Sequence, residues 1–153
     1  MDELLNRIAR SALSTAIRRS DWGVMALESV HLLGLALLFG CATLFALAAL
    51  RRGGLRSLAL PELTTQLWRL AATGLALMVA SGTLIAVSIP RKYYLDQAFR
   101  AKMLLLALAT AATVWLVRVA TRGGATAAAR ALALLAWLLW LGVGVSGRLI
   151  GFL

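Results

Sequence analysis

Glu28 and His31, a carboxylate and the only histidine of the chain, lie three residues apart near the start of a long apolar segment. Residues at this spacing share one face of a helix. Titratable groups inside a membrane-spanning segment are costly and usually mark functional sites. A histidine in this position can ligate haem iron, carry protons or hydrogen-bond a neighbour. The pair is therefore the first candidate for chemistry, as a cofactor site or as a metal site through His31.

The same residues also admit a structural interpretation, in which Glu28 pairs with Lys102 or Arg148 and His31 hydrogen-bonds a helix neighbour. Glu-x-x-His is one half of the di-iron pattern of helical bundles, but the sequence has no second copy, which disfavours a di-metal centre. A single histidine also excludes two-histidine haem ligation within one chain. A haem would need a methionine, a lysine, an open position or a second subunit as its sixth ligand.

The apolar segments that position these residues indicate the class of protein. Of 153 residues, 61% are hydrophobic, and the mean hydropathy is +0.87, which is typical of an integral membrane protein. The run Val30–Leu50 is long enough to cross a hydrocarbon core of about 30 Å as a helix. Such runs predict spans at about 22–50, 62–89, 100–119 and 127–147. The predicted fold is an all-α, four-helix transmembrane bundle, formed by a single domain over residues 21–153.

Residues 1–20 alternate apolar and basic side chains with helical period, which predicts an amphipathic helix lying in the membrane interface. Ser20 or Asp21 is the expected N-cap of the first span. The net charge is +10, from 16 Lys and Arg against 6 Asp and Glu. Because the basic residues cluster at the ends of apolar runs, we expect them to contact a bilayer with anionic lipids. No nucleic-acid partner is expected.

Four consecutive antiparallel spans place the starts of the first and third and the ends of the second and fourth on one side of the membrane, here called the terminal side. Most of the varied ionisable groups belong to this side. The stretch 90–100 there is expected to form an interfacial loop or short helix with its tyrosines at headgroup depth. The predicted cofactor-binding residues, all on the terminal side, are Glu28, His31, Tyr94, Lys102 and Arg148.

Small and polar residues follow one stripe of the second span, which we expect to face other helices because small residues let backbones approach in lipid. The stripe comprises Arg69, Thr73, Ala76, Ala80 and Thr83, and two nearby glycines, Gly74 and Gly82, lie two turns apart. The opposite side of the membrane has two tight turns of arginine and glycine. These turns are typical of cytoplasmic hairpins, which places both termini outside the cytoplasm.

Longer stretches resemble a known family. They are Ile17–Trp22, Glu28–Gly40, Ala98–Ala107 and Leu138–Gly151. Together they resemble a group of small four-helix bacterial membrane proteins known as a domain of unknown function. More distantly, the His-Leu-Leu-Gly and Phe-x-x-Lys helices are similar to copper-resistance D-type proteins and to the four-helix bacterial membrane protoporphyrinogen oxidase, which is associated with haem. The resemblance implies a multi-pass protein of the bacterial inner membrane. The family pattern has a further histidine near the end of the third span, where this chain has Val117-Arg118.

These observations predict a membrane redox or haem/quinone-associated subunit, with haem b or a quinone as the candidate cofactor. His31 would ligate the haem or bond the quinone, and Glu28 would orient it or take its proton. Lys102 and Arg148 would bind a carboxylate or propionate. The alternative is a non-catalytic scaffold or accessory subunit of a homo-oligomer or larger membrane complex. Copper or small-solute transport is a third hypothesis, weakened by the scarcity of soft ligands. Whether the chain is an enzyme stays open among these hypotheses.

Overall fold

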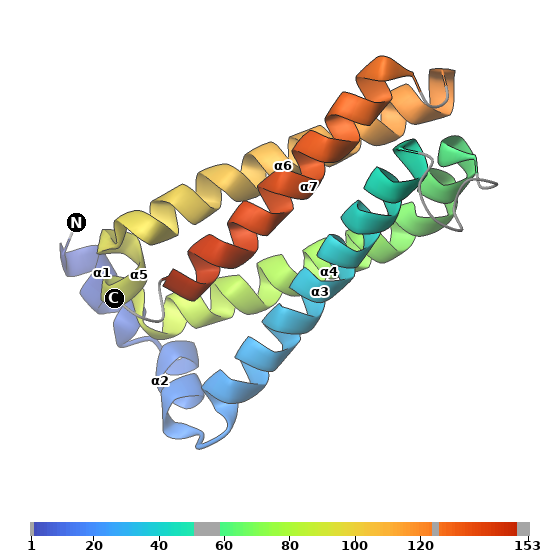
Figure 1. Ribbon diagram of the computed structural model, residues 1–153. Coiled ribbons are helices and arrows are strands. Elements are labelled where there is room, and N and C mark those ends of the chain that lie inside the picture. The colour runs from blue at the N-terminus through green and yellow to red at the C-terminus, as the bar shows by residue number, and fades with distance from the viewer. Residues whose placement is uncertain (1, 51–58, 124–125, 150–153) are drawn as a thin grey trace.

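The computed structural model describes residues 2–50, 59–123 and 126–149, and these segments are almost entirely helical (Figure 1). The elements are α1 (Asp2–Ala9), α2 (Ala12–Arg19), α3 (Gly23–Ala49), α4 (Leu60–Ser88), α5 (Pro90–Leu95), α6 (Gln97–Gly123) and α7 (Ala127–Leu149). The helices α3, α4, α6 and α7 are each long and apolar enough to cross a membrane. The predicted all-α, four-helix transmembrane bundle is confirmed.

The four spans form two hairpins that pack into a ring. α3 packs mainly on α4, and α6 packs mainly on α7. Further contacts join α3 to α7 and α4 to α6. α3 and α6 therefore occupy opposite corners of the ring, as do α4 and α7. The short helices α1, α2 and α5 lie together with the end of α7 at the terminal side (Figure 1).

α3 and α4 approach most closely where two buried glycines meet. A Cβ atom placed on Gly34 of α3 would lie 2.7 Å from the carbonyl oxygen of Gly74 of α4. A Cβ on Gly74 would lie 2.9 Å from the carbonyl oxygen of Gly34. In lipid, where apolar surface gains little from helix contact, such close backbone approach is a main source of association. The Gly34–Gly74 contact therefore sets the position of α3 on α4.

The prediction that this stripe of the second span faces other helices is wrong, although Gly74 and Gly82, expected with it, do face α3. Its five members, Arg69, Thr73, Ala76, Ala80 and Thr83, are all exposed. The face of α4 that packs in the bundle includes the buried residues Ala71, Gly74, Met78, Ser81 and Ile85. Both faces carry small residues, so residue size does not distinguish them. The face that packs is the one whose glycine fits Gly34.

Two tryptophans fasten α7 to its neighbours. The indole Nε1–H of Trp137 donates to Thr43 Oγ1 of α3 at 3.1 Å, and that of Trp140 donates to Thr113 Oγ1 of α6 at 3.0 Å. Trp140 is only 1% exposed. A buried indole N–H needs an acceptor, and in lipid this acceptor must come from another helix or from the backbone. These bonds join α7 to both of its neighbours in the ring.

The N-terminal segment forms α1 and α2 instead of the single helix expected over residues 1–20. The break follows from Ser11, whose Oγ accepts the backbone N–H of Ser14 at 3.2 Å and so caps α2. Neither Ser20 nor Asp21 caps the first span. The N-cap position of α3 is held by Trp22, which makes no capping side-chain bond.

α2 is fixed to the end of α4 by a serine and an arginine. Carbonyls at the C-terminal end of a helix lack intrahelical partners. Ser14 Oγ donates to the carbonyl oxygen of Ser88, the last residue of α4, at 3.2 Å. Arg18 Nη1 donates to the same oxygen at 2.6 Å, and its Nη2 donates to the carbonyl of Ala9 at 2.7 Å. Arg18 thus ties both short helices to α4.

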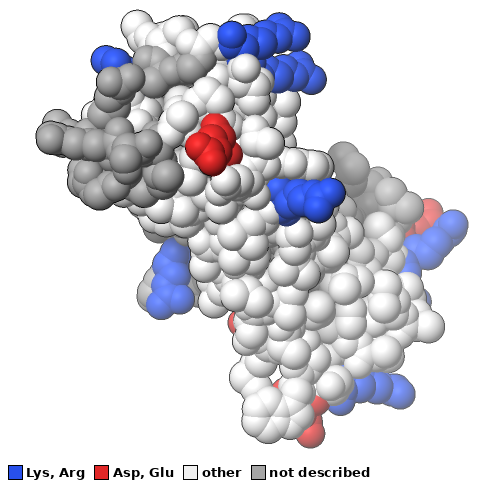
Figure 2. Space-filling view, turned by 90° about the vertical axis from the view of Figure 1, so that its right-hand side faces the viewer, with Lys and Arg blue, Asp and Glu red and all other residues white. Residues whose placement is uncertain are grey.

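The charge distribution on the surface suits a membrane-spanning bundle. In Figure 2, Lys and Arg side chains lie at the top, at the lower right and at a few places in between, and large uncharged areas separate them. Basic residues at the two interfaces of an apolar belt are typical of multi-pass membrane proteins. With its four long apolar helices, the chain is a multi-pass membrane protein.

The Gly34–Gly74 contact makes a prediction about stability. Gly34→Ala forces a Cβ against backbone atoms of α4, which we expect to destabilise the fold by about 1–3 kcal/mol. Gly40→Ala is the matched control on the same helix, because a Cβ there has no atom within 4 Å. The control should be neutral or stabilising by up to about 1 kcal/mol, since alanine favours helix over glycine. Unfolding in detergent, followed by circular dichroism, compares them, and equal stabilities would contradict the contact.

Candidate functional site

The side chains of His31 and Lys102 meet across the diagonal of the bundle. His31 projects from α3, and Lys102 projects from α6 at the opposite corner of the ring. The Nε2 atom of His31 lies 3.2 Å from Nζ of Lys102. The other ring nitrogen of His31, Nδ1, lies 3.1 Å from Oγ of Ser81 on α4. Three spans thus contribute to one line of polar contacts.

The hydrogen bonds of Ser81 assign the direction of this line. Ser81 Oγ donates its proton to the carbonyl oxygen of Leu77 at 2.6 Å. Its lone pairs then accept from His31 Nδ1–H, which leaves Nε2 of the neutral imidazole as an acceptor. Lys102 Nζ donates to that acceptor. These hydrogen bonds run from Lys102 through His31 and Ser81 to the Leu77 carbonyl. We call this series the His31–Lys102 chain.

Glycines on the two remaining corners leave room for the His31–Lys102 chain. A Cβ on Gly82 of α4 would lie 2.9 Å from Cε1 of the His31 ring. A Cβ on Gly147 of α7 would lie 3.0 Å from Nζ of Lys102. His31 stands eight residues after Gly23, about 12 Å along α3. All four spans therefore enclose the pair, nearer the terminal side than the middle of the bundle.

The other predicted site residues lie elsewhere on the terminal side. Glu28 is exposed, and within the described residues no ion pair joins it to Lys102. Burial raises the pKa of Tyr93 on α5, and the negative charge of Glu28 raises that pKa further. Tyr94 is 47% exposed, and its ring centroid lies 6.0 Å from that of Phe99. Arg148 lines a groove between α3 and α7. Of the five predicted residues, the structure brings His31 and Lys102 into hydrogen-bond contact.

Three residues of this site were missed from the sequence, namely Ser81, Gly82 and Gly147. Ser81 carried a usable signal, because a hydroxyl within an apolar span needs a partner and it neighbours Gly82 on the glycine-bearing face. The two glycines are recognisable only from the structure, because their role is to leave space for side chains that come from other helices.

The hydrogen bonds of the His31 ring oppose haem or metal binding at this residue. Both ring nitrogens are engaged within the protein, so iron could reach Nε2 only if Lys102 moved away. Among the described residues, no group of three or more His, Cys, Asp and Glu side chains could hold a metal ion. Cys41 is buried in the core of the bundle, on α3. This arrangement fits a haem ligand poorly.

The arrangement suits hydrogen-bond donation to an oxygen atom. An ammonium group has three donors. Only one of these donors is used by His31, whose Nε2 lies 3.2 Å from Nζ. Lys102 therefore keeps further Nζ–H donors for a carbonyl or anionic oxygen.

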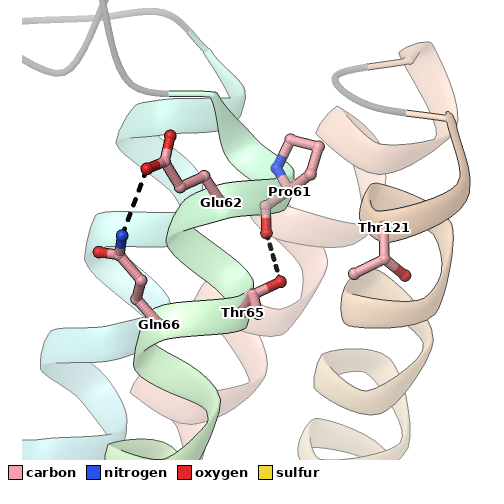
Figure 3. Close-up of a pocket in the computed structure, with 5 residues that line it drawn as sticks. All are labelled: Pro61, Glu62, Thr65, Gln66 and Thr121. Atoms are coloured by element: carbon pink, nitrogen blue, oxygen red, sulfur yellow. Dashed lines mark hydrogen bonds between the residues drawn. The ribbon is translucent and has the colours of Figure 1, made fainter.

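A separate polar hollow of about 360 Å³ lies at the opposite end of the bundle, between α4 and α6 (Figure 3). It is lined by Pro61, Glu62, Thr65, Gln66 and Thr121. Its polar groups bond within their own helices. Gln66 Nε2 donates to Glu62 Oε1 at 3.4 Å, Thr65 Oγ1 to the Pro61 carbonyl at 2.8 Å, and Thr121 Oγ1 to the Val117 carbonyl at 2.9 Å. This hollow has no titratable pair like that of His31 and Lys102.

Titration of Tyr93 tests whether the charge of Glu28 lies near it. Glu28→Gln should move the Tyr93 pKa down, toward the ordinary value of about 10. The neutral phenol is favoured in the folded protein, so the resulting stability is present below the unfolded pKa and is lost as pH rises through the folded pKa. Phenolate absorbance in a Tyr94→Phe background reports Tyr93 alone. Glu62→Gln, at the opposite end, should change nothing, and an unaltered titration in Glu28→Gln would refute the contact.

Comparison with known proteins completes this description of the site. No curated protein and no solved structure matches the chain, so the similarity to copper-resistance D-type proteins and to the protoporphyrinogen oxidase is not supported. A family model described as "Family of unknown function (DUF6644)" matches residues 8–153, which include every span and the whole His31–Lys102 chain. This match confirms the resemblance to a family of unknown function. The chain is thus a multi-pass membrane protein that belongs to the DUF6644 family.

Proposed function

We propose that this protein is a membrane subunit that binds a lipid-soluble ligand with carbonyl oxygens, of the quinone class, at the His31–Lys102 chain. The observation that carries the proposal is the 3.2 Å contact of His31 Nε2 with Lys102 Nζ inside a four-span bundle. A lysine in this position is costly in lipid, and its ammonium group donates to His31, which in turn donates to Ser81.

The hydrogen-bond donors that the His31–Lys102 chain leaves available indicate which ligand fits the site. A quinone presents carbonyl oxygens, which accept hydrogen bonds from Lys102 Nζ–H groups that His31 does not use. His31 holds the neutral tautomer set by Ser81, so its Nε2 accepts from Lys102 and orients the ammonium group. Quinones partition into the bilayer, so a site reached from lipid suits them. Haem fits less well, because iron competes with Lys102 for His31 Nε2.

We also propose that the protein resides in the bacterial inner membrane with both termini outside the cytoplasm. The arginine–glycine turns support this orientation, because basic residues at short loops favour the cytoplasmic side. Those turns fall at 51–54 and 121–124, largely outside the described residues. On this orientation the His31–Lys102 chain lies near the outer surface, where protons exchange with the space outside the cytoplasm.

Copurifying quinone tests the proposal. Lys102→Met keeps the length of the side chain but removes its charge and donors, so bound quinone should fall about tenfold, the loss expected for a hydrogen bond to a charged group. Lys92→Met is the control, because Lys92 is exposed on α5. The measurement is quinone extracted with organic solvent per mole of purified protein. Equal quinone content in both variants, or none in the wild type, would overturn the proposal.

An absorption spectrum of the same samples distinguishes haem from quinone. We expect no Soret band in the wild-type protein, oxidised or reduced. A Soret band that disappears in His31→Ala would show that the bound ligand is haem and not a quinone. Lys102 would then have to move away from His31 in the haem-bound protein.

A second candidate function, the scaffold or accessory subunit, is favoured by the outward face of α4. Arg69 faces outward from a span, where a charged side chain is costly against lipid. Thr73 and Thr83 on the same face donate to carbonyls of their own helix. A homo-oligomer or larger membrane complex would cover this face.

Cross-linking in native membranes tests this role. Substituting Leu at both Ala76 and Ala80 should abolish cross-linked species by blocking close helix approach. The matched control places Leu at Ala107 and Ala111, which are exposed on α6. Identical cross-linking in the two double variants would contradict the scaffold role of this face.

A further inference from the structure

A groove of about 450 Å³ runs between α3 and α7 on the outside of the bundle. Its walls are almost entirely apolar, and Arg148 is its one charged residue. Leu32, Leu35, Ala36 and Phe39 line it from α3, and Trp140, Leu141, Gly144, Val145 and Arg148 line it from α7. This volume falls in the range of about 300–1,000 Å³ typical of small-ligand sites.

Residues that line the groove lie one helical turn from residues at the His31–Lys102 chain, on both α3 and α7. Leu35 follows His31 by one helical turn on the same face of α3. Gly144 precedes Gly147 by three residues on α7, and Gly147 borders Lys102 Nζ. Leu35 and Gly144 face each other, since a Cβ on Gly144 would lie 3.7 Å from Leu35 Cδ2. An elongated molecule in the groove would therefore have one end near the polar pair.

We infer that this groove holds the isoprenoid tail of the quinone and gives its headgroup lateral access to Lys102 from the bilayer. This inference rests on the proposed function. The branched aliphatic and aromatic lining suits a prenyl chain, which carries no polar group to satisfy. A tail longer than the groove continues into the surrounding lipid without cost. Arg148, at the terminal-side end of the groove, can donate to a headgroup oxygen as well.

Gly144 keeps the groove open and offers a direct test. A Cβ at this position meets only Leu35 at an ordinary contact distance, so a larger side chain enters the groove instead of striking backbone. Gly40, on α3, is the matched control because it is exposed, has no atom within 4 Å of an added Cβ and does not line the groove. Leucine at either position adds the same volume and the same apolar surface.

The experiment measures binding of two probes to purified protein in lipid nanodiscs. One probe is a quinone with a long isoprenoid tail, and the other is the same headgroup without a tail. Gly144→Leu should weaken binding of the tailed quinone about tenfold or more, because the tail loses buried apolar contact. The same variant should leave the tail-less probe within about twofold, a difference small against that loss of tail contact. Gly40→Leu should change neither affinity.

The outcomes separate this inference from the proposed function. If the tailed quinone binds Gly144→Leu as well as wild type, while Lys102→Met still weakens binding, the groove is not the tail site although the quinone site stands. If neither probe binds wild type, the proposed function fails. If Gly144→Leu instead displaces a copurifying anionic phospholipid and leaves quinone affinity unchanged, the occupant is a lipid and the inference is overturned. Ala36→Leu fills the groove from the α3 wall and replaces Gly144→Leu if that variant does not fold.

Discussion

The need to satisfy polar groups away from water governs this structure. Lys102 and His31 would each be expensive in a bilayer if they faced lipid. Here Lys102 donates to His31 and His31 donates to Ser81, which in turn donates to a backbone carbonyl of α4. Among the described residues, no buried side-chain nitrogen or oxygen lacks a hydrogen-bond partner. The same constraint places Trp137 and Trp140 against threonines of neighbouring helices.

Close packing of glycines makes these polar contacts geometrically feasible. Gly34 and Gly74 let α3 and α4 approach until their backbones touch. Gly82 and Gly147 leave room for the imidazole and for the ammonium group in the centre of the ring. A methyl group at Gly82 would strike a rigid ring, whereas one at Gly147 would strike the end of a flexible side chain. The position of His31 is therefore more strictly determined than that of Lys102.

The neighbours of His31 in the structure differ from those that the sequence suggested. Glu-x-x-His suggested that Glu28 and His31 act together, but the structure gives His31 a lysine and a serine as neighbours. The negative charge of Glu28 acts instead on Tyr93, whose pKa it raises. An imidazole whose two nitrogens are both occupied within the protein is a poor haem ligand. The donors that Lys102 does not use for His31 suit a carbonyl ligand better than iron.

The sequence by itself determined the class of protein and the approximate spans, because an apolar run of sufficient length is a local property that needs no partner. Pro61 in the first turn of α4 and Thr126, whose Oγ1 accepts the N–H of Ala129 at the start of α7, follow similarly local rules. Only the tertiary structure decided which face of α4 packs and which groups meet His31, because both depend on contacts between segments far apart in the chain. The division of residues 1–20 into two helices follows instead from a local cap by Ser11. Ser81 lies 50 residues from His31, and Lys102 lies 71 residues from it, so neither spacing nor periodicity could reveal that they share one line of hydrogen bonds.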